Sequence, residues 1–422
     1  MVDYLLAAGY WVSVFILLQI LTLTICSRNV ALRPWKNSLR LMAVFWCLFA
    51  IFKKAYLDSI LLPVDALYHE TIAREVAALL REFRFSEAMS YFGIGNQSYR
   101  FLLGVFYSVT AAPELITYTV NGALAFWAML SLLEVMCLHT GCRRLPMIPV
   151  FSCMMLPSAL LWTTANLKEG PVLWATCMMV YLTCQNRLSA NQPKRGMPLL
   201  GMLILGLLRP HIAMLWLVTL SIASMLRSRQ RGLVVITGAG ALAGMFLLKT
   251  AAPQLFDEGM NDGVTASLSS RYERMTENDN LVSHSFVNVE PKPVLTGLLL
   301  IIFRPWPTEV RGVGELLAGL EVWLLASAGL IAWCRLPNKI RQLKHPNVIT
   351  MVFGLLFFGY FFSYMYNMGL MVRQRLMVYP ALLFVYFWPL LQYQTGLARL
   401  KQIPARQIHR RCTSLASQIS HA

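Results

Sequence analysis

The chain has 422 residues, of which 57% are hydrophobic and only 14% are charged, and its mean hydropathy is +0.55. Soluble domains are about half apolar and about one quarter charged, so this composition excludes an ordinary soluble domain and predicts a helical membrane protein. The formal net charge of +17 could suggest nucleic-acid binding, but the placement of the charges argues against that function.

The basic residues gather in particular segments. Six polar segments hold 21 of the 37 lysines and arginines and none of the 20 acidic residues: 27–40, 139–145, 186–197, 227–231, 335–345 and 393–422. Polytopic proteins concentrate Lys and Arg in their cytoplasmic loops. We therefore expect all six segments to face the cytoplasm and the N-terminus to lie outside. The excess charge then reflects topology and contact with anionic lipids, with no role for nucleic acid.

The first hundred residues are predicted to form two membrane helices and a polar outer loop. The apolar run 5–26 has no basic n-region and no cleavage site, so we expect a retained helix and no signal peptide. A second helix begins near residue 41 and leads into a polar outer loop, 61–97. Within that loop, residues 65–80 have apolar positions at helical spacing, which predicts an amphipathic helix on the membrane surface.

The middle of the chain alternates apolar runs with short polar breaks. The run 99–112 is short and is predicted to be interfacial or half-inserted, whereas 115–138 is long enough to cross the bilayer. The runs 146–162 and 171–185 are predicted to cross outward and inward, joined by a turn that contains Lys168-Glu169. This turn is either a solvated connection between two helices or the mouth of a polar site on the outer face.

The run 198–226 lies between two basic segments and therefore crosses twice or not at all. Arg209-Pro210 interrupts the run, because proline disrupts a helix interior, and we expect this tip to lie below the outer surface. The run 232–249 then leads out to the largest outer segment, 250–312, whose apolar piece 293–303 is too short to cross alone.

The last crossings complete the predicted topology. They are the runs 314–333, 347–366 and 376–392, and the last two are joined by an outer turn from Met368 to Gln374. The sequence thus predicts an all-α polytopic bundle with about eleven crossings, plus interfacial or re-entrant helices. This membrane domain spans residues 1–392, with outer loops 61–97 and 250–312, and a basic cytoplasmic tail follows at 393–422.

With the sides assigned, polar residues from distant segments gather at the outer face. The acidic or titratable candidates are Asp65, His69, Glu70 and Glu169, and the cationic candidates are Arg100, Lys168, Arg209, Arg304, Arg373 and Arg375. Cations on this face run against the positive-inside bias, and arginine donates two hydrogen bonds at once to a phosphate. The pattern therefore favours an anionic ligand, and a ligand that is also held in the membrane suggests a lipid phosphate.

Polyprenyl-phosphate or polyprenyl-diphosphate sugars fit that description. Glycosyl transfer from such a carrier needs a carboxylate to accept the proton of the acceptor hydroxyl and fixed positive charge for the departing phosphate. Asp65 is the first candidate for the base, with Glu70 and Glu169 behind it, and the cations would hold the phosphate. Two simpler interpretations stay open: Asp65 as the N-cap of its helix, and Arg373 with Arg375 as interfacial anchors.

Several blocks of this chain resemble the multi-spanning GT-C glycosyltransferases of bacterial envelopes. They are Asp65-Ala66-Leu67-Tyr68, Val120-Asn121-Gly122, Pro157-Ser158 through Trp162 to Leu167-Lys168-Glu169, Leu208-Arg209-Pro210, Arg304-Pro305-Trp306-Pro307, and Asn367-Met368-Gly369 with Arg373-Gln374-Arg375. The resemblance is piecewise, over about residues 60–380. It implies a GT-C-like fold and a periplasmic site, and the missing Asp-x-Asp in the first loop leaves a divalent metal open. The nearest acidic spacing is Glu277-Asn278-Asp279.

The resemblance therefore implies an enzyme of the bacterial inner membrane that adds sugar to a glycan or lipid acceptor in surface polysaccharide synthesis. Three alternatives remain. An O-antigen-type polymerase or ligase uses the same chemistry, a transporter or flippase would move a lipid-linked sugar, and a scaffold would only support an export complex. The nearly charge-free middles of the apolar runs, with Arg209 and Glu321 as the main exceptions, disfavour transport.

Overall fold

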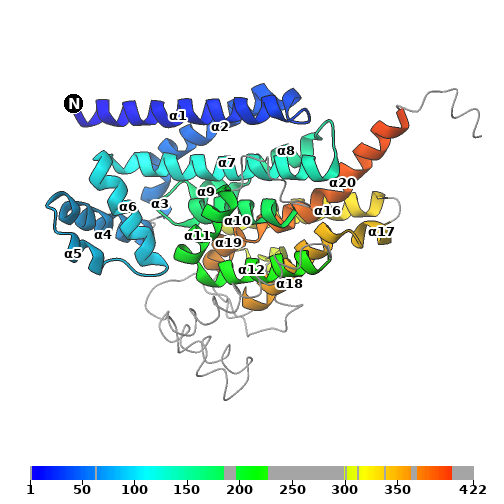
Figure 1. Cartoon of the computed structure of the whole chain (residues 1–422). Helices are drawn as coiled ribbons and strands as arrows, with labels where there is room; N and C mark the ends of the chain where they lie inside the picture. The colour runs from blue at the N-terminus through cyan, green and yellow to red at the C-terminus, as the bar shows by residue number, and fades with distance from the viewer. Residues whose placement is uncertain are drawn as a thin grey trace, which may run out of the picture.

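The computed structural model describes residues 2–61, 64–184, 196–226, 299, 302–310, 313–336, 339–362 and 368–401. Within these residues the chain is all-helical and has no strand, which confirms the predicted all-α class (Figure 1). The predictions for the run 232–249, for most of the outer segment 250–312 and for the tail beyond residue 401 lie outside the described residues.

Three helices are long and apolar enough to cross a bilayer, and they support a membrane protein. The segments are Ala7–Arg28, Glu114–Thr140 and Leu316–Arg335. They belong to α1 (Val2–Arg28), α7 (Glu114–Thr140) and α16 (Val313–Arg335). The other apolar segments are shorter, and they are Met147–Thr163, Gly196–Leu208, Pro210–Leu226 and Pro346–Gly359.

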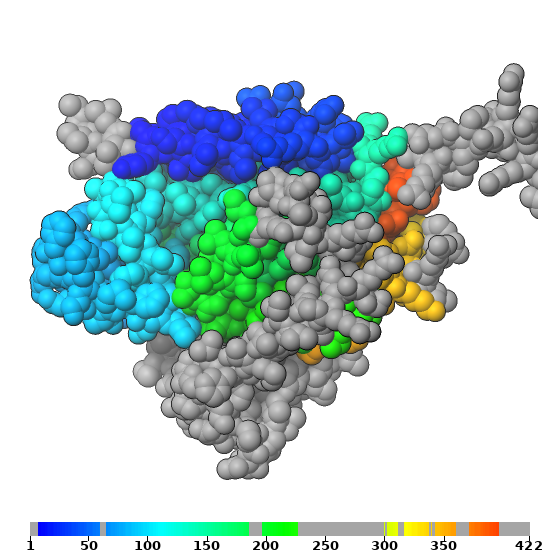
Figure 2. Space-filling model, in the orientation of Figure 1, coloured from blue at the N-terminus to red at the C-terminus, as the bar shows by residue number. Residues whose placement is uncertain are grey.

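The centre of the molecule is α7. It packs against α1, α2 (Lys36–Phe52), α10 (Glu169–Cys184) and α20 (Tyr379–Lys401). Most of its apolar span is buried inside the protein, whereas most of α1 and of α16 is not. Figure 2 shows α1 and α2 along one edge of the molecule, so α7 is a core helix that positions its neighbours.

A compact group of helices lies at one end of the long helices (Figure 1). It consists of α4 (Val64–Arg81), α5 (Phe85–Ser90) and α6 (Asn96–Thr110). Ala73 and Val76 of α4 are buried, and a Cβ added to Gly104 of α6 would lie 2.6 Å from Val76. The predicted amphipathic helix at 65–80 is therefore present, but α6 covers its inner face, and the apolar side chain of Leu67 is exposed.

Prolines divide two of the apolar runs. The run 146–162, predicted to be one helix, forms α8 (Met147–Met154) and α9 (Pro157–Thr163). The reason is that the residue before a proline avoids the helical region, and Leu156 is extended. The indole of Trp46 donates to the Met154 carbonyl at 2.8 Å, which satisfies an acceptor at the break. As predicted, Arg209 separates α11 (Gly196–Leu208) from α12 (Pro210–Leu226).

The remaining elements are short helices and the last crossing candidates. They are a 3-10 turn at Arg33–Trp35, a π turn at Lys53–Leu57, α3 (Asp58–Leu61), a 3-10 turn at Pro307–Glu309, α17 (Lys339–Leu343), α18 (Pro346–Phe362) and α19 (Met368–Arg375). We expected residues 368–374 to be an outer turn, but α19 is helical there. Only Gly369 in this stretch disfavours a helix, and basic residues in its last turn suit the helix C-terminus.

Candidate functional site

The segment that contains Lys168-Glu169 is buried. Every residue from 163 to 170 is buried, so the segment is not a solvated turn. The Asn121 amide of α7 donates to the carbonyls of Ala165 and Leu167 at 2.7 and 3.3 Å. A Cβ at Gly170 would lie 2.9 Å from the Asn121 carbonyl oxygen, so glycine permits the close approach of α10 to α7. These contacts fix the backbone from which the two charged side chains extend.

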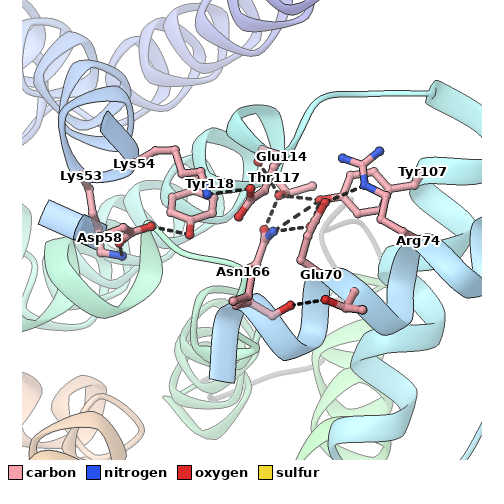
Figure 3. A network of polar contacts seen from close by, with 12 residues as sticks. Lys53, Lys54, Asp58, Glu70, Arg74, Tyr107, Glu114, Thr117, Tyr118 and Asn166 are labelled. Carbon is pink, nitrogen blue, oxygen red and sulfur yellow. Dashed lines mark hydrogen bonds and ion pairs between the residues drawn. The ribbon is translucent and has the colours of Figure 1, made fainter. Parts of the chain in front are cut away.

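A buried polar network attaches the same segment to α4 (Figure 3). The Asn166 amide donates to Glu70 Oε2 at 2.6 Å and accepts from the Thr117 hydroxyl. The Tyr107 hydroxyl also donates to Glu70, and Arg74 pairs with its other oxygen at 2.6 Å. Burial raises the pKa of Glu70, while Tyr107 and Arg74 oppose that rise. Glu70, a candidate for the base, is thus engaged on both oxygens and acts as a structural link.

A second group of charges in Figure 3 lies at the end of α2 and the start of α7. Lys53 pairs with Asp58 at 3.0 Å, and Lys54 pairs with Glu114 at 2.6 Å. The Tyr118 hydroxyl donates to Asp58 at 2.6 Å. The ammonium groups of Lys53 and Lys54 lie 5.1 and 5.2 Å from the centre of the Tyr118 ring. These charges neutralise one another, so they contribute little net charge to this end of the helices.

Four of the predicted site residues form one continuous ion-pair chain. Asp65 Oδ2 lies 2.5 Å from Arg373 Nη1, and Glu169 Oε1 lies 2.6 Å from Arg373 Nε and 3.1 Å from Arg209 Nη2. The side chain of Asp65 is 65% exposed, those of Arg373 and Arg209 are 12% and 11% exposed, and that of Glu169 is 1% exposed. The ion-pair chain joins α4, α19, α10 and the α11–α12 break, and it leads from solvent into the protein.

Lys168 lies beside this ion-pair chain and is buried, with 6% of its surface exposed. Its Nζ donates to the Leu208 carbonyl at 3.5 Å, and no carboxylate pairs with it among the described residues. The pKa of Lys168 is lowered to about 7, mainly by burial and also by the neighbouring Arg209, while Glu169 opposes the shift. The amine is therefore only partly protonated near neutral pH, and an anion bound beside it would favour the charged form.

Arg100 of α6 lies against the face of α4 that carries Asp65. Its Nε donates to His69 Nδ1 at 3.0 Å, and its guanidinium lies 4.3 Å from the centre of the Tyr68 ring. Burial lowers the pKa of His69 to about 4, and Arg100 contributes to the shift. His69 is therefore neutral, and because Nδ1 accepts, its proton is on Nε2. No carboxylate pairs with Arg100 in the described part of the chain.

Arg304 and Arg375 meet at a different position. Arg304 pairs with Glu309 at 2.5 Å, and its main-chain carbonyl accepts from Arg375 Nη2. Both side chains are buried. The two predicted cations thus contact each other through the backbone, two residues along the chain from Arg373, and Arg304 already has an acidic partner.

Glu321 is the carboxylate in the middle of α16. It accepts from the Ser158 amide and hydroxyl at 2.7 and 2.5 Å, and from the Tyr379 hydroxyl. The carboxylate therefore connects α16 to α9 and α20 within an apolar region. This arrangement explains how a mid-helix charge is tolerated without assigning it a substrate.

Several residues that organise the site are not among the predicted site residues. Asn166 and Tyr107 carry the contacts to Glu70, and Tyr68 supports Arg100. The available signal is an uncharged amide, Asn166, two residues before the charged pair Lys168-Glu169. Such a residue can satisfy several backbone and side-chain groups at once.

Comparisons with protein-family models, curated proteins and solved structures found no match to this chain. Among the described residues, no group of three or more His, Cys, Asp and Glu side chains is placed to hold a metal ion. The acidic pair Glu277 and Asp279 lies outside the described residues.

Proposed function

We propose that this chain is a GT-C-type glycosyltransferase of the bacterial inner membrane. It would transfer a sugar from a polyprenyl-phosphate or polyprenyl-diphosphate carrier to a glycan or lipid acceptor at the periplasmic face. The observation that carries the proposal is the ion-pair chain, in which the contact between Asp65 and Arg373 joins residues 308 positions apart. Charges from four separate elements, arranged beside Lys168, suit the binding of an anionic ligand better than the anchoring of one helix.

The proposed fold is a polytopic bundle of about eleven crossings, and the shared direction of the three long helices agrees with its orientation. In Figure 1 the C-terminal ends of α1, α7 and α16 point toward the same end of the molecule. The basic residues Arg28, Arg144 and Arg335 lie at or just after those ends. The group α4 to α6 lies at the opposite end. By the positive-inside rule this opposite end is periplasmic, and it carries Asp65.

Asp65 is the proposed general base, because it is the exposed carboxylate of the ion-pair chain. Its oxygen accepts the proton from the acceptor hydroxyl as the acceptor oxygen bonds to the anomeric carbon. The bond from the anomeric carbon to the phosphate oxygen breaks, and the departing phosphate takes the electron pair. Arg373 contacts Asp65 at 2.5 Å, so a phosphate that draws Arg373 away would leave Asp65 a stronger base.

The phosphate is proposed to bind Arg373, Arg209 and Lys168. Lys168 has no carboxylate partner among the described residues, and an anion beside it would shift it to the charged form. Glu169 holds both arginines at Oε1, while its Oε2 is buried and has no hydrogen-bond partner among the described residues. Glu169 is therefore proposed as a positioning residue in place of the base.

The proposal is tested with purified protein in nanodiscs and short polyprenyl-linked sugars. Asp65→Asn is expected to lower the transfer rate by about 100-fold or more, as loss of a general base does. Arg373→Gln should lower it as well. The matched control is Glu75→Gln, which removes an exposed carboxylate from the same helix and should leave the rate unchanged. Wild-type protein that releases no sugar from any polyprenyl-linked donor, or full activity of Asp65→Asn, would contradict the proposal.

The product of the same assay separates the alternatives. A single added sugar indicates a transferase, repeated addition of oligosaccharide indicates an O-antigen-type polymerase, and transfer to a lipid core indicates a ligase. Movement of intact donor across the bilayer without bond cleavage would indicate a transporter and would refute the enzyme.

A further inference from the structure

The side chains around Arg100 form a second cationic position next to the ion-pair chain. Asp65, Tyr68 and His69 are spaced i, i+3 and i+4 along α4, so they share one face of that helix. Asp65 contacts Arg373, and His69 contacts Arg100. Each guanidinium group therefore contacts a residue on a different turn of one helix face, and these two α4 residues lie about 6 Å apart along the helix axis.

The local contacts orient Arg100. His69 accepts from its Nε at 3.0 Å, and the Tyr68 ring lies 4.3 Å from the guanidinium carbon. His69 is 2% exposed and is held in place by its edge contact with Tyr99, at 5.5 Å between ring centres. These contacts occupy Nε and one face of the guanidinium. Among the described residues its two terminal nitrogens have no hydrogen-bond partner, so its outer edge presents a prearranged fork.

The charge of Arg100 is also uncompensated. His69 is neutral, and no carboxylate in the described ranges pairs with Arg100. Arg74 is a similar arginine in the same helix pair, and its guanidinium lies 3.9 Å from the centre of the Tyr107 ring. Arg74, however, is neutralised by Glu70 at 2.6 Å. A guanidinium that is oriented by its neighbours but left without an anion is suited to an anionic ligand.

We propose that Arg100 binds the second phosphate of a diphosphate-linked donor, while Arg373, Arg209 and Lys168 bind the first. This inference rests on the proposed function, and it selects polyprenyl diphosphate over polyprenyl monophosphate as the carrier. A diphosphate places two anionic groups on neighbouring phosphorus atoms, and the two guanidinium groups that contact consecutive turns of α4 can each reach one of them. A monophosphate would leave one of the two positions unoccupied.

The test measures the binding of farnesyl diphosphate, farnesyl phosphate and inorganic pyrophosphate to the full chain in nanodiscs. The wild-type protein should bind farnesyl diphosphate about tenfold tighter than farnesyl phosphate, or more, because a charged hydrogen-bonded contact is added. Arg100→Gln should remove that preference and leave the affinity for farnesyl phosphate unchanged. Arg100→Lys keeps the charge but not the fork, so its preference should be intermediate. Binding of pyrophosphate as tight as that of farnesyl diphosphate would assign the site to free pyrophosphate and overturn the lipid carrier.

The matched control is Arg74→Gln, which removes a stacked but neutralised guanidinium from the same helix pair and should keep the preference. Thermal unfolding of each variant confirms that it is folded. If Arg100 only connects α6 to α4, Arg100→Gln will lower the unfolding midpoint and leave the preference intact, which overturns the proposal. A wild-type protein without any preference also overturns it. The proposed function fails separately, when neither monophosphate-linked nor diphosphate-linked sugars are transferred.

Discussion

The buried contact between Glu169 and Arg373 gives a prediction that does not depend on any substrate. Arg373→Gln removes the partner at 2.6 Å and leaves the buried Glu169 with Arg209 at 3.1 Å. Glu169→Gln makes the converse change and leaves two arginines without their shared anion. We predict that each single change destabilises the protein strongly and that the double change costs much less than their sum.

The magnitude follows from burial. Removing one partner of a buried ion pair costs about 3–5 kcal/mol of stability. Because Arg209 still pairs with Glu169 in Arg373→Gln, we expect this variant to lose about 3 kcal/mol, at the lower end of that range. The lost contact with exposed Asp65 adds at most about 1 kcal/mol. If Glu169→Gln loses a similar amount, the two single variants together lose about 6 kcal/mol. The double variant should lose only about 3–4 kcal/mol, and the difference is a coupling energy of about 2–3 kcal/mol between the two residues.

The measurement is the thermal unfolding of purified protein in detergent. With a midpoint shift of about 2 °C per kcal/mol, each single variant should unfold about 6 °C below the wild type, and the double variant close to the single variants. Arg84→Gln is the control, because Arg84 pairs with Glu82 and Glu87 at 3.0 and 2.5 Å but is exposed. It should not shift the midpoint measurably. Strictly additive shifts of the Glu169 and Arg373 variants would refute the buried ion pair.

Three further predictions concern single side chains. The pKa of His69 is lowered from 6.5 to about 4, so between these pH values the unfolded chain binds more protons than the folded protein. The free energy of unfolding should therefore fall by about 3 kcal/mol as the pH falls through that window. His69→Gln should remove this part of the pH dependence of the unfolding midpoint, which an unchanged slope would contradict. Asn166→Ala removes the bond to Glu70 at 2.6 Å and should lower stability by about 2–3 kcal/mol, whereas the exposed Asn96→Ala should not change the midpoint. Glu321→Gln keeps one acceptor oxygen for the Ser158 and Tyr379 hydroxyls and loses the bond from the Ser158 amide, so it should lower the unfolding midpoint less than Glu321→Leu, which removes both acceptors. Equal midpoints for the two variants would refute the anchoring role.

The element boundaries were predictable where local chemistry decides them. Pro113 and Pro210 each begin or precede a helix, because a proline cannot continue a helix from the preceding turn. The effect of Pro157 was underestimated, since the run 146–162 is apolar throughout and reads as one helix. The helix at 368–375 was missed because a short span between two longer runs resembles a turn.

The roles of the acidic residues needed tertiary information. The charge rule placed Asp65, Glu70 and Glu169 on one side of the membrane, but it does not say which cations each one meets. The helical spacing held part of the answer, because Glu70 lies five residues after Asp65 and therefore points about 140° away from it around the helix. Its partner Asn166 lies 96 positions along the chain, and no local pattern predicts such a contact.

The exposure gradient along the ion-pair chain separates chemistry from architecture. Asp65, at the solvent end, contributes a contact that is weak because its side chain is 65% exposed, so Asp65→Asn should abolish transfer and barely change stability. Glu169, at the buried end, holds two arginines from different helices, so its replacement should lower both stability and activity. Asp65 lies in the first turn of α4, which begins at Val64, so it is not the N-cap that the sequence left open. If Asp65 only supported this helix start, Asp65→Asn would keep full activity and would cost at most about 1 kcal/mol of stability. The activity of Asp65→Asn therefore separates a general base from a residue that only supports the helix.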